Sequence, residues 1–183
     1  SSFKPSPLRG LVYAVTYTAT LGRYAGRLNS GVRPHMDIDS MHVYDKAKYH
    51  LESVEKAGLP EEHASNHIVP MLRWLIENEL MSEFFVTEGS EPLSHYREGR
   101  ISIHELFDWW DTCLVSDLLS DRGNAFAMHY FDYDQGEYLS DYQRILQGSL
   151  PSEFHVVYSN ANYSKLQTVI DEHYKNWLAA NEA

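Results

Sequence analysis

Along most of the chain, apolar residues recur every three or four positions, which is the spacing of helices that bury one face. The strongest run covers residues 68–80. Pro70 fits this run only in the first turn, so the helix is expected to begin near Ser65 or Asn66. The same spacing over residues 44–54 predicts a helix there as well. The pattern favours a bundle of short helices.

The most clearly marked helix begins after Ser102. Ser102 and Glu105 have the spacing of a capping box, in which each side chain accepts a hydrogen bond from the other residue's backbone N–H. Apolar residues continue on one face as far as Cys113 and Leu114, which the pattern places in the same helix. Trp110 lies in the middle of this face, so we expect it to be buried.

The second half of the chain continues the helical pattern. Helices are predicted over residues 121–131 and 138–146, and a last one runs from Asn160 or Asn162 through Trp177. Residues 154–158, Phe-His-Val-Val-Tyr, are the best strand candidate, with an extended connection as the alternative. We therefore predict a mainly α, compact multi-helix domain with at most a small β element.

Charge divides the chain near residue 40. Residues 1–35 hold five of the 15 Lys and Arg residues and no Asp or Glu, so the rest of the chain carries ten bases against 26 acids. We interpret residues 1–40 as a basic N-terminal segment and residues 41–183 as an acidic helical domain. The segment fits non-native or dispensable sequence, an organellar transit peptide, or a basic arm folded onto the acidic body.

The acidity of the body bears on its partners. Binding to nucleic acid depends on Lys and Arg that neutralise phosphates, so an acidic body argues against it and instead attracts a basic protein. No apolar stretch is as long as a membrane helix, and the single cysteine, Cys113, permits no intrachain disulfide. These features predict a soluble, cytoplasmic protein, and they leave the oligomeric state open.

Ten histidines raise the question of a metal site. His63 and His67 have the spacing of a zinc-binding pair on a helix, but no Glu follows His63 and no third ligand lies near in the sequence. Packing or a hydrogen bond near the start of a helix is the simpler role for His67. Cys113 is expected to be buried and apolar in character rather than a nucleophile. The chain has no phosphate-binding loop, nucleophile elbow or dinucleotide fingerprint, so no catalytic residue, cofactor or metal is predicted.

Acids and aromatic residues alternate in two regions of the chain and indicate a protein interface. Aromatic side chains anchor such interfaces, and acids around them favour a basic partner. The alternative is that most of these rings belong to the core. The predicted partner-binding residues are Asp108, Trp109, Asp111, Asp132, Tyr133, Asp134, Glu137 and Asp141.

Four short motifs carry a family resemblance. They are His-Ile with Leu72 and Trp74 in residues 67–74, Gly-Asn-Ala-Phe with Tyr-Phe in residues 123–131, Tyr-Leu-Ser-Asp-Tyr in residues 138–142, and Phe-His-Val in residues 154–156. Through them, residues 41–177 resemble a family of small uncharacterised bacterial domains. By analogy they also resemble the immunity proteins that are encoded beside bacterial toxins. The resemblance implies no catalytic residue.

Two function hypotheses follow from the sequence. The first is a non-enzymatic protein-binding domain, specifically an immunity-type inhibitor of a basic bacterial toxin. The alternative is a metal-dependent or carboxylate-based hydrolase that uses the His and Asp residues. A toxin gene beside this one would support the first hypothesis, and a stoichiometric metal in the purified protein would support the second.

Overall fold

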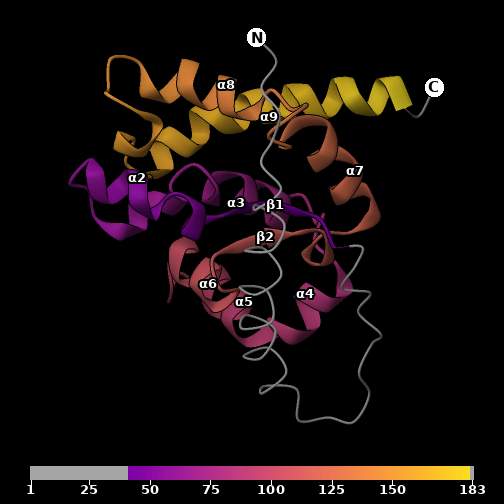
Figure 1. Cartoon of the computed structure of the whole chain (residues 1–183). Helices are drawn as coiled ribbons and strands as arrows, with labels where there is room; N and C mark the ends of the chain where they lie inside the picture. Colours follow the sequence, from indigo (N-terminus) through magenta and orange to yellow (C-terminus); the bar gives the residue numbers. More distant parts are fainter. Residues whose placement is uncertain (1–40, 182–183) are drawn as a thin grey trace, which may run out of the picture. The chain divides into compact units, whose positions relative to one another are not determined.

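The computed structural model describes residues 41–181, and these form a mainly α domain with one small β-ribbon (Figure 1). The basic segment, residues 1–40, lies outside the described residues, so its role stays a prediction. The predicted fold class, mainly α with a small β element, is confirmed. The helices and strands are β1 (Val43–Lys46), α2 (Leu51–Lys56), α3 (Val69–Glu77), α4 (Glu83–Glu88), α5 (Ser90–Arg97), α6 (Ile103–Trp109), β2 (Cys113–Val115), α7 (Asp121–Tyr130), α8 (Tyr138–Tyr142) and α9 (Asn160–Asn181).

The β-ribbon pairs two segments that the sequence pattern assigned to helices. Strand β1 runs antiparallel to β2, with Asp45 opposite Leu114, and the register shifts between Val43 and Asp45. Such a shift is a β-bulge, which re-aims the side chains beside it. The helix predicted over residues 44–54 is therefore wrong in its first part: the chain forms β1 and a short 3-10 turn, Ala47–Tyr49, before α2 begins.

The capped helix is also shorter than predicted. The capping box of Ser102 and Glu105 is confirmed, but α6 ends at Trp109, so Cys113 lies in β2 and not in the helix. Asp111 and Thr112 adopt φ values of 54° and 52°, a left-handed conformation that ends the helical path. Ladder hydrogen bonds to β1 outweigh the local helical pattern here.

The helices lie on both sides of the ribbon (Figure 1). Helices α8 and α9 lie on one side of β1 and β2, whereas α4, α5 and α6 lie on the other. Helix α3 contacts both α9 and α6, so it joins the two sides. Pro70 sits in the first turn of α3 as expected, but this helix begins at Val69, after a 3-10 turn over Glu61–Ser65.

Aromatic side chains dominate the buried interior. Trp110 is completely buried, as predicted, and its ring stacks on that of Phe85 at 4.9 Å between centroids. On the other side of the fold, Trp74 packs against Phe126 and Tyr174 at 5.2 and 5.1 Å. These clusters anchor α3, α6 and α9 around the ribbon.

The C-terminal predictions hold in part. Helices α7 and α9 match their predicted ranges closely, and α9 begins at Asn160. The helix predicted over residues 138–146 is α8, which continues as a π-helical turn over Gln143–Gln147. The strand predicted at residues 154–158 does not form: Glu153–His155 is a 3-10 turn, and residues 156–159 follow as a connection without regular secondary structure, closer to the alternative. Within the part of the chain that is described, no helix is both long and apolar enough to cross a membrane.

Candidate functional site

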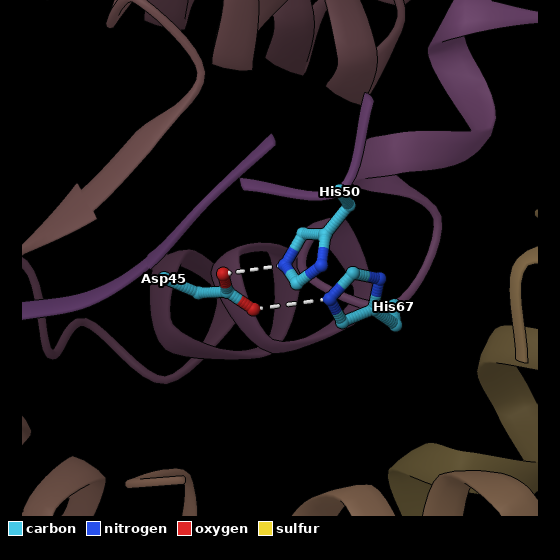
Figure 2. Close-up of side chains that lie close together, drawn as sticks. All are labelled: Asp45, His50 and His67. Atoms are coloured by element: carbon cyan, nitrogen blue, oxygen red, sulfur yellow. Dashed lines mark hydrogen bonds and ion pairs between the residues drawn. The ribbon is translucent and has the colours of Figure 1, made fainter. Parts of the chain in front are cut away.

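Three polar side chains from separate parts of the chain converge beside the β-ribbon. The carboxylate of Asp45 lies between two imidazole rings, with 2.8 Å from its Oδ1 to Nε2 of His50 and 3.0 Å from its Oδ2 to Nε2 of His67. Figure 2 shows both rings turning the same nitrogen toward the carboxylate. We call these three residues the Asp45 cluster.

Local structure explains why each side chain points inward. Asp45 follows the bulge of β1, and His50 closes the 3-10 turn that leads directly into α2. His67 lies in the turn just before α3, where its backbone carbonyl accepts a hydrogen bond from the Tyr138 hydroxyl at 2.8 Å. The cluster therefore depends on β1, α2, α3 and α8 together.

The cluster is nearly closed to solvent. The side chains of Asp45, His50 and His67 are 2%, 13% and 3% exposed, so solvent reaches the cluster mainly from the side of His50. The ring of Phe154 lies 5.5 Å from that of His50 and 5.7 Å from that of His67. An isolated carboxylate at such a place would be costly, and the two histidines offset that cost.

The charge of Asp45 is stabilised within the fold. Burial on its own raises the pKa of Asp45, but hydrogen bonds from His50 and His67, together with their positive charge, outweigh it and hold the pKa well below its usual range. The backbone N–H of Lys46 also donates to Oδ1 at 2.6 Å. The carboxylate is therefore ionised at neutral pH and available as a ligand.

The second nitrogen of His67 identifies its tautomer. Nδ1 of His67 is buried and has no hydrogen-bond partner among the described residues. A neutral ring at this place carries its proton on Nε2, where Asp45 accepts it, because a buried N–H without a partner is costly. In the metal-free protein, the carboxylate of Asp45 therefore forms one hydrogen bond with each of the two histidines.

The same three groups are also suited to a metal ion. One atom from each residue, two imidazole nitrogens and a carboxylate oxygen, lie within 4.8 Å of one another. Nitrogen and oxygen donors of this kind suit zinc and neighbouring transition metals and do not suit magnesium or calcium, which prefer oxygen alone. Three protein ligands leave at least one coordination position for water or substrate.

The structure separates the two histidines that the sequence spacing had paired. His63 takes no part in the Asp45 cluster, because its Nδ1 donates to the carbonyl of Phe154 at 2.6 Å. His67 makes a hydrogen bond ahead of a helix, as expected, but its partner is Asp45. The sequence pattern missed Asp45 and His50, since a helical interpretation of residues 44–54 treated both as ordinary polar positions. An acid directly after the apolar pair Val43–Tyr44 was the available signal.

The first group of predicted partner-binding residues lies on and after α6. Asp108 is exposed, while Trp109 and Asp111 are half-buried. The ring of Trp109 packs edge-on against that of Trp110 at 4.6 Å, so it does not project freely from the body. Burial, the largest influence, raises the pKa of Asp108. Their role in binding a partner stays a prediction.

The second group lies between α7 and the middle of α8, across the ribbon from α6 (Figure 1). Tyr133, Asp134 and Glu137 are exposed, and Asp132 is half-buried with its Oδ2 atom 3.2 Å from Nε2 of His42.

Asp141 differs from the other predicted partner-binding residues. It is only 8% exposed, and its carboxylate accepts hydrogen bonds from Tyr130 and Arg144. Nε2 of His173 lies 3.0 Å from its Oδ2 atom, so Asp141 does not suit a role at an exposed rim.

Comparison with known proteins gives a family but no activity. A family model described as a domain of unknown function, DUF7832, matches residues 43–156. No curated protein and no solved structure matches the chain. The matched range contains the whole Asp45 cluster and Tyr133.

Proposed function

We propose that this chain, which belongs to the family of the domain of unknown function DUF7832, binds one divalent transition-metal ion at the Asp45 cluster and uses it to activate water for hydrolysis. The observation that carries the proposal is the convergence of two imidazole nitrogens and one carboxylate within 4.8 Å. Zinc is the expected ion, because it accepts this mixture of ligands readily. Bound water at the remaining position would lose its proton near neutral pH.

Metal binding must replace the hydrogen bonds of the metal-free cluster. Zinc–ligand bonds of about 2.0–2.1 Å in a tetrahedral site place ligand atoms about 3.3 Å apart. That separation is slightly longer than the 2.8 and 3.0 Å contacts of Asp45 with His50 and His67. The two histidines contact different oxygens of Asp45, so the carboxylate and the rings must shift to bring one oxygen and both nitrogens around the ion. The Nε2 protons must also leave.

Binding of a metal ion carries a free-energy cost at Nδ1 of His67. When Nε2 binds the ion, the remaining proton sits on Nδ1, which is buried and has no hydrogen-bond partner within residues 41–181. An unsatisfied buried donor costs about 1–3 kcal/mol. Structural zinc sites release about 10–16 kcal/mol on binding, so this cost weakens the site without preventing occupation.

The test is calorimetric titration of the metal-free protein, prepared without a histidine tag, with zinc and with magnesium. We expect one zinc ion per chain, release of protons on binding, and no measurable binding of magnesium. His50→Ala should abolish the zinc signal. His129→Ala, which removes an exposed histidine on α7, is the matched control and should bind like the unmodified protein.

Two results would refute metal binding. One is the absence of stoichiometric zinc in a folded protein. The other is equal zinc affinity of the His50→Ala and His129→Ala variants. Circular dichroism melting of each variant shows whether a lost signal reflects a lost ligand or a lost fold. If zinc does not bind, the cluster acts only as a hydrogen-bonded support for the fold.

A second candidate is the immunity-type protein that inhibits a basic bacterial toxin. It is supported by the exposed acids Asp108, Asp134 and Glu137 and by Tyr133, whose side chain is 52% exposed. Complementary charge of this kind speeds the encounter with a basic partner. The test is growth of bacteria that express the gene beside this one, with and without this chain. Equal growth in both cases would oppose the candidate.

A further inference from the structure

We propose that Tyr133 and the acids around it select a substrate that carries a positive charge next to the bond to be hydrolysed. This inference rests on the metal-dependent activity proposed above. It assigns to the Asp45 cluster a substrate class, namely esters or amides of acids with a cationic ammonium group.

Tyr133 lies where solvent reaches the cluster. Its ring stacks on that of His50, with 6.4 Å between centroids and 21° between ring planes. His50 is the most exposed of the three proposed ligands, and Tyr133 is itself 52% exposed. Since Tyr133 is 52% exposed and lies beside His50, a ligand can reach the exposed part of this aromatic face. A cation over such a face, within about 6 Å of its centre, is attracted by the π-electrons.

The loop that carries Tyr133 is held in place by its own contacts. Oδ1 of Asp132 accepts hydrogen bonds from the backbone N–H groups of Asp134 and Gln135 at 3.0 and 3.2 Å. The other oxygen of Asp132 lies 3.2 Å from Nε2 of His42. The ring is therefore presented by a fixed turn rather than by a free chain.

The charges around Tyr133 favour a cation. Residues 132–137, Asp-Tyr-Asp-Gln-Gly-Glu, contain three acids and no Lys or Arg. Asp134 and Glu137 of this stretch are exposed, so their charges attract a cation to the ring.

The reaction balances with water alone. A metal-bound water loses a proton, and the resulting hydroxide attacks the carbonyl carbon of the ester. The bond between carbon and the alcohol oxygen then breaks, and the alcohol leaves with the proton that the water released. The products are a carboxylic acid and an alcohol. The ammonium group contacts the ring of Tyr133 and takes no part in the bonds that form or break.

The test compares two para-nitrophenyl esters with the zinc-loaded protein. One is the ester of gamma-trimethylammonio-butyrate, and the other is its neutral isostere, in which carbon replaces the nitrogen. We expect a higher kcat/KM for the cationic ester. Tyr133→Ala should lower the ratio of the two kcat/KM values about two- to fivefold, the effect of a cation–π contact at an exposed site. Tyr133→Phe should keep most of the preference, because it keeps the aromatic face.

Matched variants separate the aromatic and the electrostatic contributions. Asp134→Asn should lower the preference by a smaller factor that fades at high salt, because exposed charges are screened. Glu88→Gln removes an exposed acid on α4, on the other side of the ribbon, and should leave the preference unchanged. Zinc affinity of each variant is measured alongside, so that a change in metal loading is not mistaken for a change in selectivity.

The outcomes distinguish this inference from the metal site itself. Zinc binding with equal rates for the two esters, or with a ratio unaffected by Tyr133→Ala, would overturn the substrate class and leave the metal site standing. Binding of gamma-trimethylammonio-butyrate to the metal-free protein, followed by NMR, tests the cation site without any hydrolysis. Tyr133-dependent binding there would support it even if zinc fails to bind, and binding unchanged by Tyr133→Ala would refute it.

Discussion

Replacing Tyr138 with phenylalanine should destabilise the fold through the backbone that carries His67. The Tyr138 hydroxyl donates to the carbonyl oxygen of His67 at 2.8 Å, and the residue is only 2% exposed. Phenylalanine keeps the ring contacts with Tyr130 and Phe131, whose centroids lie 5.7 and 4.8 Å away. The change therefore removes one buried donor and almost no packing.

The expected loss follows from the carbonyl that is left behind. A buried acceptor without its partner costs about 1–3 kcal/mol, so the free energy of unfolding should fall by that amount. Zinc affinity should fall as well, because the carbonyl contact fixes the turn on which His67 is placed. Urea unfolding measures the first effect, and zinc titration of the folded variant measures the second.

Ser140→Ala, which removes a hydroxyl from an exposed residue of α8, is the control. A surface change of this kind should alter the free energy of unfolding by less than about 0.5 kcal/mol. If Tyr138→Phe were as stable as this control, the hydrogen bond to His67 would contribute nothing, and the support of the cluster by α8 would be refuted.

Three further predictions concern buried groups. Trp110→Ala should lower the free energy of unfolding by about 3–5 kcal/mol, because the ring is completely buried, and thermal melting measures this. Burial raises the pKa of the Cys113 thiol, so little thiolate forms near neutral pH. A thiol reagent such as DTNB should therefore react only after denaturant is added, and rapid reaction of the native protein would contradict this. Asp141→Asn should cost about 1–3 kcal/mol in urea unfolding because its carboxylate is buried and hydrogen-bonded. Asp134→Asn on the exposed loop should lower the free energy of unfolding by less than about 0.5 kcal/mol. Equal losses for the two variants would show that the hydrogen bonds of Asp141 do not stabilise the fold.

Local signals predicted the elements that depend on local contacts. The Ser102–Glu105 capping box forms as its spacing indicates, with hydrogen bonds of 3.1 and 2.7 Å. Helices α7 and α9 begin close to where their polar caps and apolar spacing placed them. In each case the residues that determine the structure lie within about one helical turn of one another.

The incorrect predictions concern segments that pair with residues far away in the sequence. Residues 44 and 114 have apolar neighbours at helical spacing, and only the antiparallel contact of β1 with β2 converts both segments to strands. That contact joins positions about 70 residues apart, as in the pairing of Val43 with Val115. A periodic pattern within a short window carries no information about such a partner, which is why tertiary contacts override it.

The candidate site was hidden for the same reason. His67 stood out beside a helix start, but its partner Asp45 is 22 residues earlier in a segment interpreted as helical. His50 is placed by a short 3-10 turn that has no strong sequence signature. The topology of the ribbon, and not the spacing of the ligands, brings the three side chains together.

Two acids are buried in the described part of the chain, Asp45 and Asp141, and they show why a count of charges cannot locate such a site. Asp141 is held by Tyr130, Arg144 and His173, and the permanent charge of Arg144 neutralises it at every physiological pH. By contrast, the two side chains that lower the pKa of Asp45 are both histidines. Imidazole can exchange its proton for a metal ion, whereas a guanidinium cannot. Of the two buried carboxylates, Asp45 is therefore the one whose surroundings permit metal binding, although both count equally toward the negative charge of the chain.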